Sequence, residues 1–112
     1  MTYERTLSAL ADPTRRRIFE GLRASPLTVG EIAARQPVSR PAVSQHLRVL
    51  EGAGLVAAEP RGTRRYYRLR REGLGELKAW LDGFWTDVLA AYAAHVEVRN
   101  GASDDRTDPQ GD

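Results

Sequence analysis

One segment of the sequence carries side chains that can hydrogen-bond to the edges of DNA bases. Between residues 40 and 50, Val43, Leu47 and Leu50 recur at the spacing of one helical face. On the opposite face, glutamine can pair with adenine, arginine with guanine or a phosphate, and serine with either. The residues of that face are Arg40, Pro41, Ser44, Gln45 and Arg48. We predict that this helix enters the major groove of DNA, with Gln45 and Arg40 at base edges.

A second polar cluster surrounds Gly62, where we expect a tight turn. Guanidinium groups on a hairpin tip can bind phosphates or enter the adjacent minor groove. The residues of this cluster are Arg61, Thr63, Arg64 and Arg65, with Arg68 close by. His46 lies at the border of the apolar helical face, where packing is more typical and a phosphate contact is the lesser alternative. Taken alone, both clusters could also be ordinary solvated surface.

The chemistry of an enzyme is missing from the sequence. It holds two histidines and no cysteine, and it has no Gly-rich phosphate loop after a strand. Ser44 and His46 are two residues apart on one helix, so their side chains point in different directions and make no catalytic dyad. We predict a protein that is not an enzyme and that holds no cofactor.

The elements around the polar clusters favour DNA binding over the solvated-surface alternative. Thr28 to Glu31 fits a capping box that opens a short helix, and Pro37 closes it. Ser39 caps the next helix, which runs from Arg40 to about Gly52. Two short helices joined by a tight turn are a helix-turn-helix. Two further helices are expected before it, at Thr2–Ala11 and from Asp12-Pro13 to about Ser25-Pro26.

A hairpin and a long helix complete the predicted fold. Strands over 55–59 and 65–69, joined by a turn at 60–63, form the wing, and a helix follows from about Glu72 to about Val98. The fold class is mostly α with a small β-hairpin, a winged helix-turn-helix of five helices plus wing. We expect one DNA-binding and dimerisation domain over residues 1–99, and a disordered acidic tail over residues 100–112.

The last predicted helix carries more apolar surface than one small domain can cover. A stripe this wide, which includes both tryptophans, indicates a homodimer. The expected interface residues, on the first and last helices, are Tyr3, Leu7, Leu77, Leu81, Phe84, Trp85, Val88 and Tyr92. The alternative is a helix whose excess apolar surface is simply exposed.

The charge is divided unevenly along the chain. Residues 1–71 hold fourteen arginines and six acidic residues, whereas residues 72–112 hold three basic and nine acidic residues. The basic part suits a polyanion such as double-stranded DNA. Without cysteine, disulfides and thiolate metal ligands are excluded. Because no stretch has the length of a membrane span and no apolar signal core is visible, we expect a cytoplasmic protein without a membrane partner.

Three segments of the chain resemble the ArsR family of winged-helix repressors. They are Leu7–Arg16, Ser39–Leu50 and the strand and wing residues Gly54–Val56 and Arg64–Leu69. The resemblance covers roughly residues 5–85. It implies a dimer built from the first and last helices, two recognition helices in successive major grooves, and repression that an inducer relieves.

The chain departs from the family where its members bind metal. Many of them use cysteines at the start of the helix before the recognition helix, where this chain has Leu27–Glu31. Others bind zinc on the last helix, and the four corresponding positions here are Asp82, Phe84, His95 and Val98. Since two of these are apolar, they cannot close a tetrahedral zinc site. The chain therefore resembles the metal-independent subgroup, some of whose members are autorepressors.

The sequence thus predicts a sequence-specific DNA-binding regulator, a repressor that binds a palindromic operator as a homodimer, with an unknown inducer or protein partner left open. The alternative is a winged-helix protein-interaction module without DNA binding. The outward Arg40, Gln45 and Arg48 count against that alternative, because interaction surfaces favour apolar and aromatic side chains.

Overall fold

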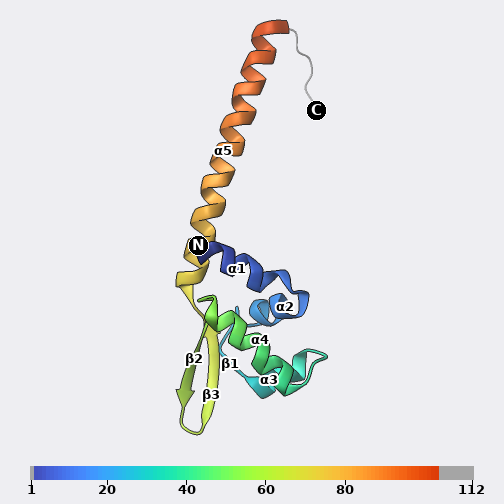
Figure 1. The fold of residues 1–112 in the computed structure, drawn as a ribbon, viewed down its shortest axis with the longest axis vertical. Helices are drawn as coiled ribbons and strands as arrows, with labels where there is room; N and C mark the ends of the chain where they lie inside the picture. The colour runs from blue at the N-terminus through green and yellow to red at the C-terminus, as the bar shows by residue number, and fades with distance from the viewer. Residues whose placement is uncertain (1, 104–112) are drawn as a thin grey trace. The chain divides into compact units, whose positions relative to one another are not determined.

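The computed structural model describes the backbone of residues 2–103 and the side chains of residues 3–96. In chain order its elements are α1 (Thr2–Ala11), α2 (Pro13–Gly21), β1 (Leu27–Thr28), α3 (Val29–Arg35), α4 (Arg40–Gly52), β2 (Val56–Arg61), β3 (Arg64–Leu69) and α5 (Arg71–Ser103) (Figure 1). This confirms the predicted winged helix-turn-helix of five helices and a hairpin, with α3 and α4 as its two helices.

The helix-turn-helix begins where the capping residues require. The Thr28 hydroxyl accepts a hydrogen bond from the Glu31 backbone N–H at 3.1 Å, and the Glu31 carboxylate accepts one from the Thr28 N–H at 2.9 Å. The predicted capping box is therefore complete. At the start of α4, the Ser39 hydroxyl accepts from the Ala42 N–H at 3.3 Å. These bonds satisfy donors that a helix start otherwise leaves without partners.

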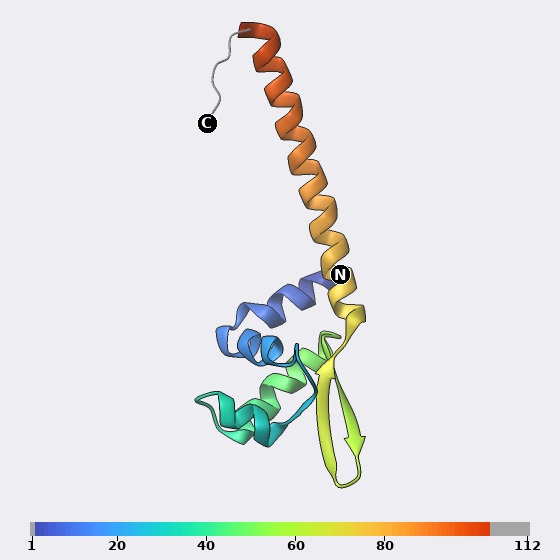
Figure 2. The ribbon, with the colours of Figure 1, turned by 180° about the vertical axis from the view of Figure 1, so that it is seen from behind.

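The sheet contains a strand that the sequence did not predict. The strand order is β1-β3-β2, and Leu27 and Thr28 of β1 pair antiparallel with Tyr67 and Tyr66 of β3 (Figure 2). Two residues are too few to produce a detectable alternation of apolar and polar side chains. β1 joins the wing to the start of α3, so the wing is fixed to the helix-turn-helix along one strand.

The hairpin turn is tighter than the predicted one. Pro60 pairs with Arg65 and Arg61 with Arg64, so only Gly62 and Thr63 lie between the strands. Pro60 is tolerated in β2 because this is an edge strand, where a missing N–H can face solvent. Gly62 takes a φ of 62°, which a glycine adopts without steric cost.

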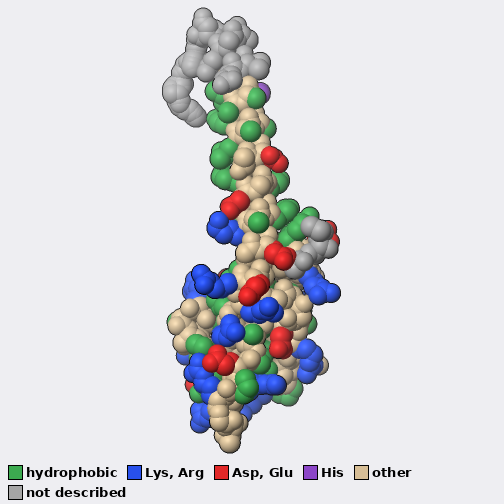
Figure 3. Space-filling model, turned by 90° about the vertical axis from the view of Figure 1, so that its left-hand side faces the viewer, with side chains coloured by type: hydrophobic (Ala, Val, Ile, Leu, Met, Phe, Trp, Pro, Cys, Tyr) green, Lys and Arg blue, Asp and Glu red, His purple; other side chains and the backbone are tan. Residues whose placement is uncertain are grey.

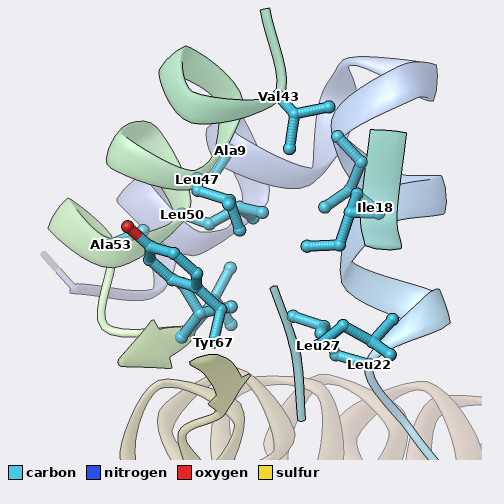
Figure 4. Close-up of a cluster of buried hydrophobic side chains, with 12 residues drawn as sticks. Ala9, Ile18, Leu22, Leu27, Val43, Leu47, Leu50, Ala53 and Tyr67 are labelled. Carbon is cyan, nitrogen blue, oxygen red and sulfur yellow. The ribbon is translucent and has the colours of Figure 1, made fainter. Parts of the chain in front are cut away.

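The core lies where α2, α4 and the sheet meet. Figure 4 shows Val43 and Leu47 of α4 pointing toward Ile18 of α2, with Tyr67 of β3 closing the cluster beside Leu47 and Leu50. Val43, Leu47 and Leu50 are fully buried, which confirms the predicted inward face of the recognition helix. Because these side chains fix the rotation of α4, its remaining faces are available to a partner.

The inward face of α1 is built from small side chains. Thr6 and Ala9 are buried there, whereas Leu7 is 41% exposed and Tyr3 is only half-buried. These small side chains allow α1 to approach its neighbours closely. Leu7 is therefore an apolar side chain on the surface.

At two glycines, the turn after α4 contacts the first turn of α5. The Gly73 N–H donates to the Gly54 carbonyl oxygen at 3.1 Å, and Gly54 has a φ of +76°. A Cβ atom on Gly73 would lie 2.4 Å from that same oxygen. Only a glycine permits so close an approach of two backbones, so both positions are fixed by local geometry.

The chain divides into two compact units, one up to Lys78 and one from Ala79. We call the first the head. α5 continues to Ser103, beyond its predicted end near Val98 and into the first residues of the predicted tail. Residues 104–112 of that tail lie outside the described residues, and the division at residue 99 stays a prediction. Within the described chain, no helix has an apolar stretch sufficient to cross a membrane.

Candidate nucleic-acid interface

The outward side of α4 presents polar side chains, as predicted. Pro41, Gln45 and Arg48 are exposed, and Ser44 is half-buried between them. Pro41 is accommodated because it lies in the first turn, where a backbone N–H has no helical partner. The small Ser44 side chain lets a neighbouring surface approach the helix closely. This face can therefore present an amide and a guanidinium to the floor of a groove.

His46, on α4, is half-buried. The hydrogen bond from the Arg15 backbone N–H holds the pKa of Asp12 below its ordinary value, and the charges of Arg15 and His46 act in the same direction. The partial burial of His46 is consistent with the packed interpretation, while a phosphate contact stays a prediction.

The wing arginines fall into two groups. Glu59 pairs with Arg61 at 3.3 Å and with Arg68 at 3.4 Å. The Arg61 guanidinium also lies 4.7 Å from the ring centroid of Tyr66. Among the described residues, no carboxylate pairs with Arg64 or Arg65, and both are exposed. Their charges are therefore the ones most available to an anion, together with the exposed Thr63 hydroxyl at the turn.

The arginines at the start of α2 have an internal role. Arg15 Nε donates to the Ala9 carbonyl oxygen at 2.6 Å, and Arg16 Nη1 donates to the Leu10 carbonyl oxygen at 3.0 Å. Both carbonyls belong to the last turn of α1, where positive charge is favourable. The acceptors of Arg15 and Arg16 are therefore backbone carbonyl oxygens at the end of α1.

In the second unit, the side chains from Ala79 to His95 are all exposed, and that of Val96 is half-buried. Phe84 is 52% exposed, Trp85 is 56% exposed, and the Trp80 and Phe84 rings stack with centroids 5.8 Å apart. The other large exposed apolar side chains here are Leu81, Val88, Leu89 and Tyr92. Figure 3 shows hydrophobic side chains along this helix, in contrast to the many arginines over the head. Leu77, in the head, is half-buried.

Asp82 and His95, the two side chains of ligand type at the family's zinc positions, are far apart within one chain. Asp82 and His95 are thirteen residues apart on α5, roughly 20 Å along the helix axis at 1.5 Å per residue. In the part of the chain that the structure describes, no three histidine, aspartate or glutamate side chains cluster as a metal ion requires.

One contributor to the interface went unnoticed in the sequence. Gly30, in the first turn of α3, lies against the guanidinium of Arg40, whose Nη2 would be 2.9 Å from a Cβ atom at this position. A glycine inside a capped helical turn is a detectable signal, because helix interiors disfavour it. The neighbour that requires it could not be read from the sequence, since ten residues separate the two positions.

Comparison with known proteins places the chain among DNA-binding regulators. Residues 10–58 match a family model described as a helix-turn-helix domain. The chain is 54% identical to the HTH-type transcriptional regulator Rv2034 of Mycobacterium tuberculosis, over 84% of this chain and 88% of that protein. It is 34% identical to the transcriptional repressor SdpR of Bacillus subtilis, over 68% of this chain and 84% of that protein.

One of the similar solved structures is a homodimer. It is the solution NMR structure of the homodimeric winged helix-turn-helix DNA-binding domain of Mb0332 from Mycobacterium bovis, described as a possible ArsR-family transcriptional regulator. The two chains are 31% identical and superpose with a TM-score of 0.62, over 79% of this chain and 82% of that one.

Proposed function

The chain belongs to the ArsR family of winged helix-turn-helix DNA-binding regulators, and we propose that it is a transcriptional repressor that binds a palindromic operator as a homodimer. The observation that carries the proposal is the exposed polar face of α4, beside the wing residues Arg64 and Arg65. Side chains on such a face can read base edges, while the wing arginines bind the backbone.

Repression is supported by the similarity to SdpR, which is named a transcriptional repressor. A protein that occupies its operator in two adjacent major grooves blocks the same DNA to other proteins. We expect the protein to act in the cytoplasm, where DNA of the bacterial relatives lies.

Dimerisation is supported by the homodimeric Mb0332 domain and by the exposed apolar stripe of α5. We propose that this stripe, with Leu7 and Tyr3 of α1, packs against a second copy of the chain. The expected interface is Tyr3, Leu7, Leu77, Leu81, Phe84, Trp85, Val88 and Tyr92. A two-fold axis then places two recognition helices about 34 Å apart, one turn of DNA, which favours a palindromic site.

We also infer that the protein works without a bound metal ion. Of the four positions that hold zinc on the last helix of related regulators, only Asp82 and His95 carry ligand side chains, and Phe84 and Val98 do not. Release from DNA would then depend on an inducer or a protein partner of another kind.

The proposal is tested by fluorescence anisotropy with random duplex DNA at low and high salt, followed by selection of bound sequences from a random pool. We expect tight binding at low salt that weakens steeply as salt rises, because phosphate contacts release counterions. The selected sequences should contain an inverted repeat. A protein that binds no duplex at low salt is not a DNA-binding regulator, and selected sites without symmetry would contradict the dimer on a palindrome.

A further inference from the structure

A hollow of about 580 Å³ opens between the first turn of α3, the first residue of α4 and the first two residues of β3. Arg40, Arg64 and Arg65 line it together with Gly30 and Glu31. We call this site the arginine hollow. It brings the recognition helix and the wing together at one place, although the sequence separates them by more than twenty residues.

Gly30 determines where the Arg40 side chain lies. A Cβ atom built on Gly30 would be 2.9 Å from Arg40 Nη2 and 3.1 Å from Arg40 Cζ. The guanidinium therefore occupies the space that any other side chain at position 30 would fill. Because the crowded atoms are the end of a long, exposed side chain, a larger residue would displace the guanidinium and leave the backbone in place.

The charges of the arginine hollow are only partly compensated. Among the described residues, no ion pair involves Arg40, Arg64 or Arg65. Glu31 is the one acidic residue in the lining, and its Oε1 accepts the Thr28 N–H at 2.9 Å as part of the capping box. Three guanidinium groups thus face one carboxylate that is already bonded to the backbone, so the hollow suits an added anion.

We propose that the arginine hollow binds one backbone phosphate of the DNA, with Gly30 as the positioning residue for Arg40. This inference rests on the proposed function. If α4 lies in a major groove and the wing lies over the neighbouring groove, the strand that separates the two grooves must pass between them, over the hollow. The phosphates of that strand are anionic, whereas base edges carry no net charge, and guanidinium groups bind phosphate oxygens in a bidentate manner.

The proposal changes the role of Arg40. On sequence grounds Arg40 was expected to contact a base edge beside Gln45. Held against Gly30 and grouped with two wing arginines, it belongs instead to the backbone contacts, and sequence reading is left to Ser44, Gln45 and Arg48.

The first test is Arg40→Ala, measured by binding isotherms for the selected operator and a random duplex across a salt series. We expect both affinities to fall by the same factor, roughly 10- to 100-fold. The slope of log affinity against log salt should decrease by about two in a dimer, since each subunit loses one contact. Arg23→Ala, which removes an exposed arginine just after α2, is the charge-matched control and should change both quantities much less. A narrowed ratio of operator to random affinity with an unchanged slope would overturn the proposal, because Arg40 would then read a base.

Gly30→Ala tests the positioning role without removing any charge. We expect weaker binding to both duplexes with a melting temperature no lower than that of the wild type, since alanine favours a helix. Gly75→Ala, at an exposed position with no atom within 4 Å of its Cβ, is the matched control and should bind DNA as the wild type does. If Gly30→Ala binds like the wild type, or loses affinity only because it melts earlier, Gly30 does not position Arg40.

A double-mutant cycle, which combines modified DNA with the Arg40 variant, identifies the ligand. Single phosphates of the operator are replaced by neutral methylphosphonates, and each duplex is titrated with wild type and Arg40→Ala. One replacement in each half-site should weaken the wild type and add nothing in the variant, because the partner is already lost. If every replacement costs both proteins equally, no phosphate lies in the hollow.

Inorganic phosphate, titrated against the wild-type complex at constant ionic strength, distinguishes a DNA phosphate from a free anion. Displacement of DNA at submillimolar phosphate would identify a free-anion site and contradict the proposal, while displacement no greater than that by chloride agrees with it. A wild type that binds no DNA would overturn the proposed function. If the wild type binds DNA and the Arg40 and Gly30 variants bind it with the same affinity, only the proposal for the arginine hollow is overturned.

Discussion

The head and the helix that follows it differ in the burial of their apolar side chains. In the head, Val43 and Leu47 are fully buried, and the surface is rich in arginine. In the second unit, Leu81 is 50% exposed and Phe84 is 52% exposed. The difference indicates that the head completes its own core, while the helix depends on a further apolar surface. The proposed DNA contacts therefore lie in the head, whereas most of the proposed dimer interface lies on the helix.

The largest expected effect comes from placing a charge on the apolar stripe. Phe84→Asp should convert the dimer to a monomer, because an unpaired carboxylate in an apolar interface loses its hydration. Sedimentation at micromolar concentration should give about twice 12.4 kDa for the wild type and about one copy for the variant.

Ala90→Asp is the control for this substitution, since position 90 faces away from the stripe at 100° per residue. It should remain dimeric. A wild type that sediments as a well-behaved monomer would contradict the interface, and the palindromic operator with it.

The next largest effect is the loss of stability caused by a substitution in the core of the head. Leu47→Ala should lower the free energy of unfolding by about 2–5 kcal/mol, because the side chain is fully buried and its removal leaves a cavity. Urea denaturation monitored by circular dichroism measures the change. Val49→Ala, on the same helix but 45% exposed, should cost less than the buried substitution.

Phe84→Asp and Leu47→Ala together test whether the head and the helix act independently. Folded Leu47→Ala should still sediment as a dimer, because the apolar stripe is intact. Loss of the dimer in this variant at low urea would show that the head and the helix do not act independently.

A smaller effect is expected at the junction of α4 and α5. In Gly73→Ala the new Cβ would meet the Gly54 carbonyl, so one backbone must shift, at a cost of about 1–3 kcal/mol. Gly75→Ala should have the opposite sign and stabilise the chain by about 0.5–1 kcal/mol, because it meets no atom and favours the helix. Thermal melting of the pair checks both signs, and a stabilising Gly73→Ala would be inconsistent with the close approach.

The smallest expected effect is that of zinc, which should neither bind tightly nor release DNA. A titration with a competing chelator measures the affinity, and anisotropy with labelled duplex measures the release. A submicromolar zinc affinity accompanied by loss of DNA binding would refute the metal-independent proposal.

Local signals made most of the head predictable. Thr28 with Glu31 and Ser39 before Arg40 mark helix starts through bonds that span three residues, and the structure contains them. The inward residues of α4 were identified correctly, because one apolar face dominates that helix.

Features that depend on distant neighbours were missed. β1 has two residues, the inward face of α1 is made by Thr6 and Ala9, and Gly30 has its purpose only beside Arg40. None of these leaves a periodic pattern in the sequence. The acceptors of Arg15 and Arg16 lie in the preceding helix, and no local pattern indicates them either.

The division of the DNA surface is tested most directly by Gln45→Ala and Arg65→Ala, each titrated with operator and random duplex across a salt series. A lost bidentate base contact costs about 1–3 kcal/mol on the correct sequence only. Gln45→Ala should therefore narrow the gap between the two duplexes with little change in salt slope. Arg65→Ala should weaken both and flatten the slope by about two in a dimer. If Arg65→Ala changes only operator preference, or Gln45→Ala changes only the salt slope, the account is contradicted. The recognition helix would then not be the part that reads bases, or the wing would not be the part that binds the backbone.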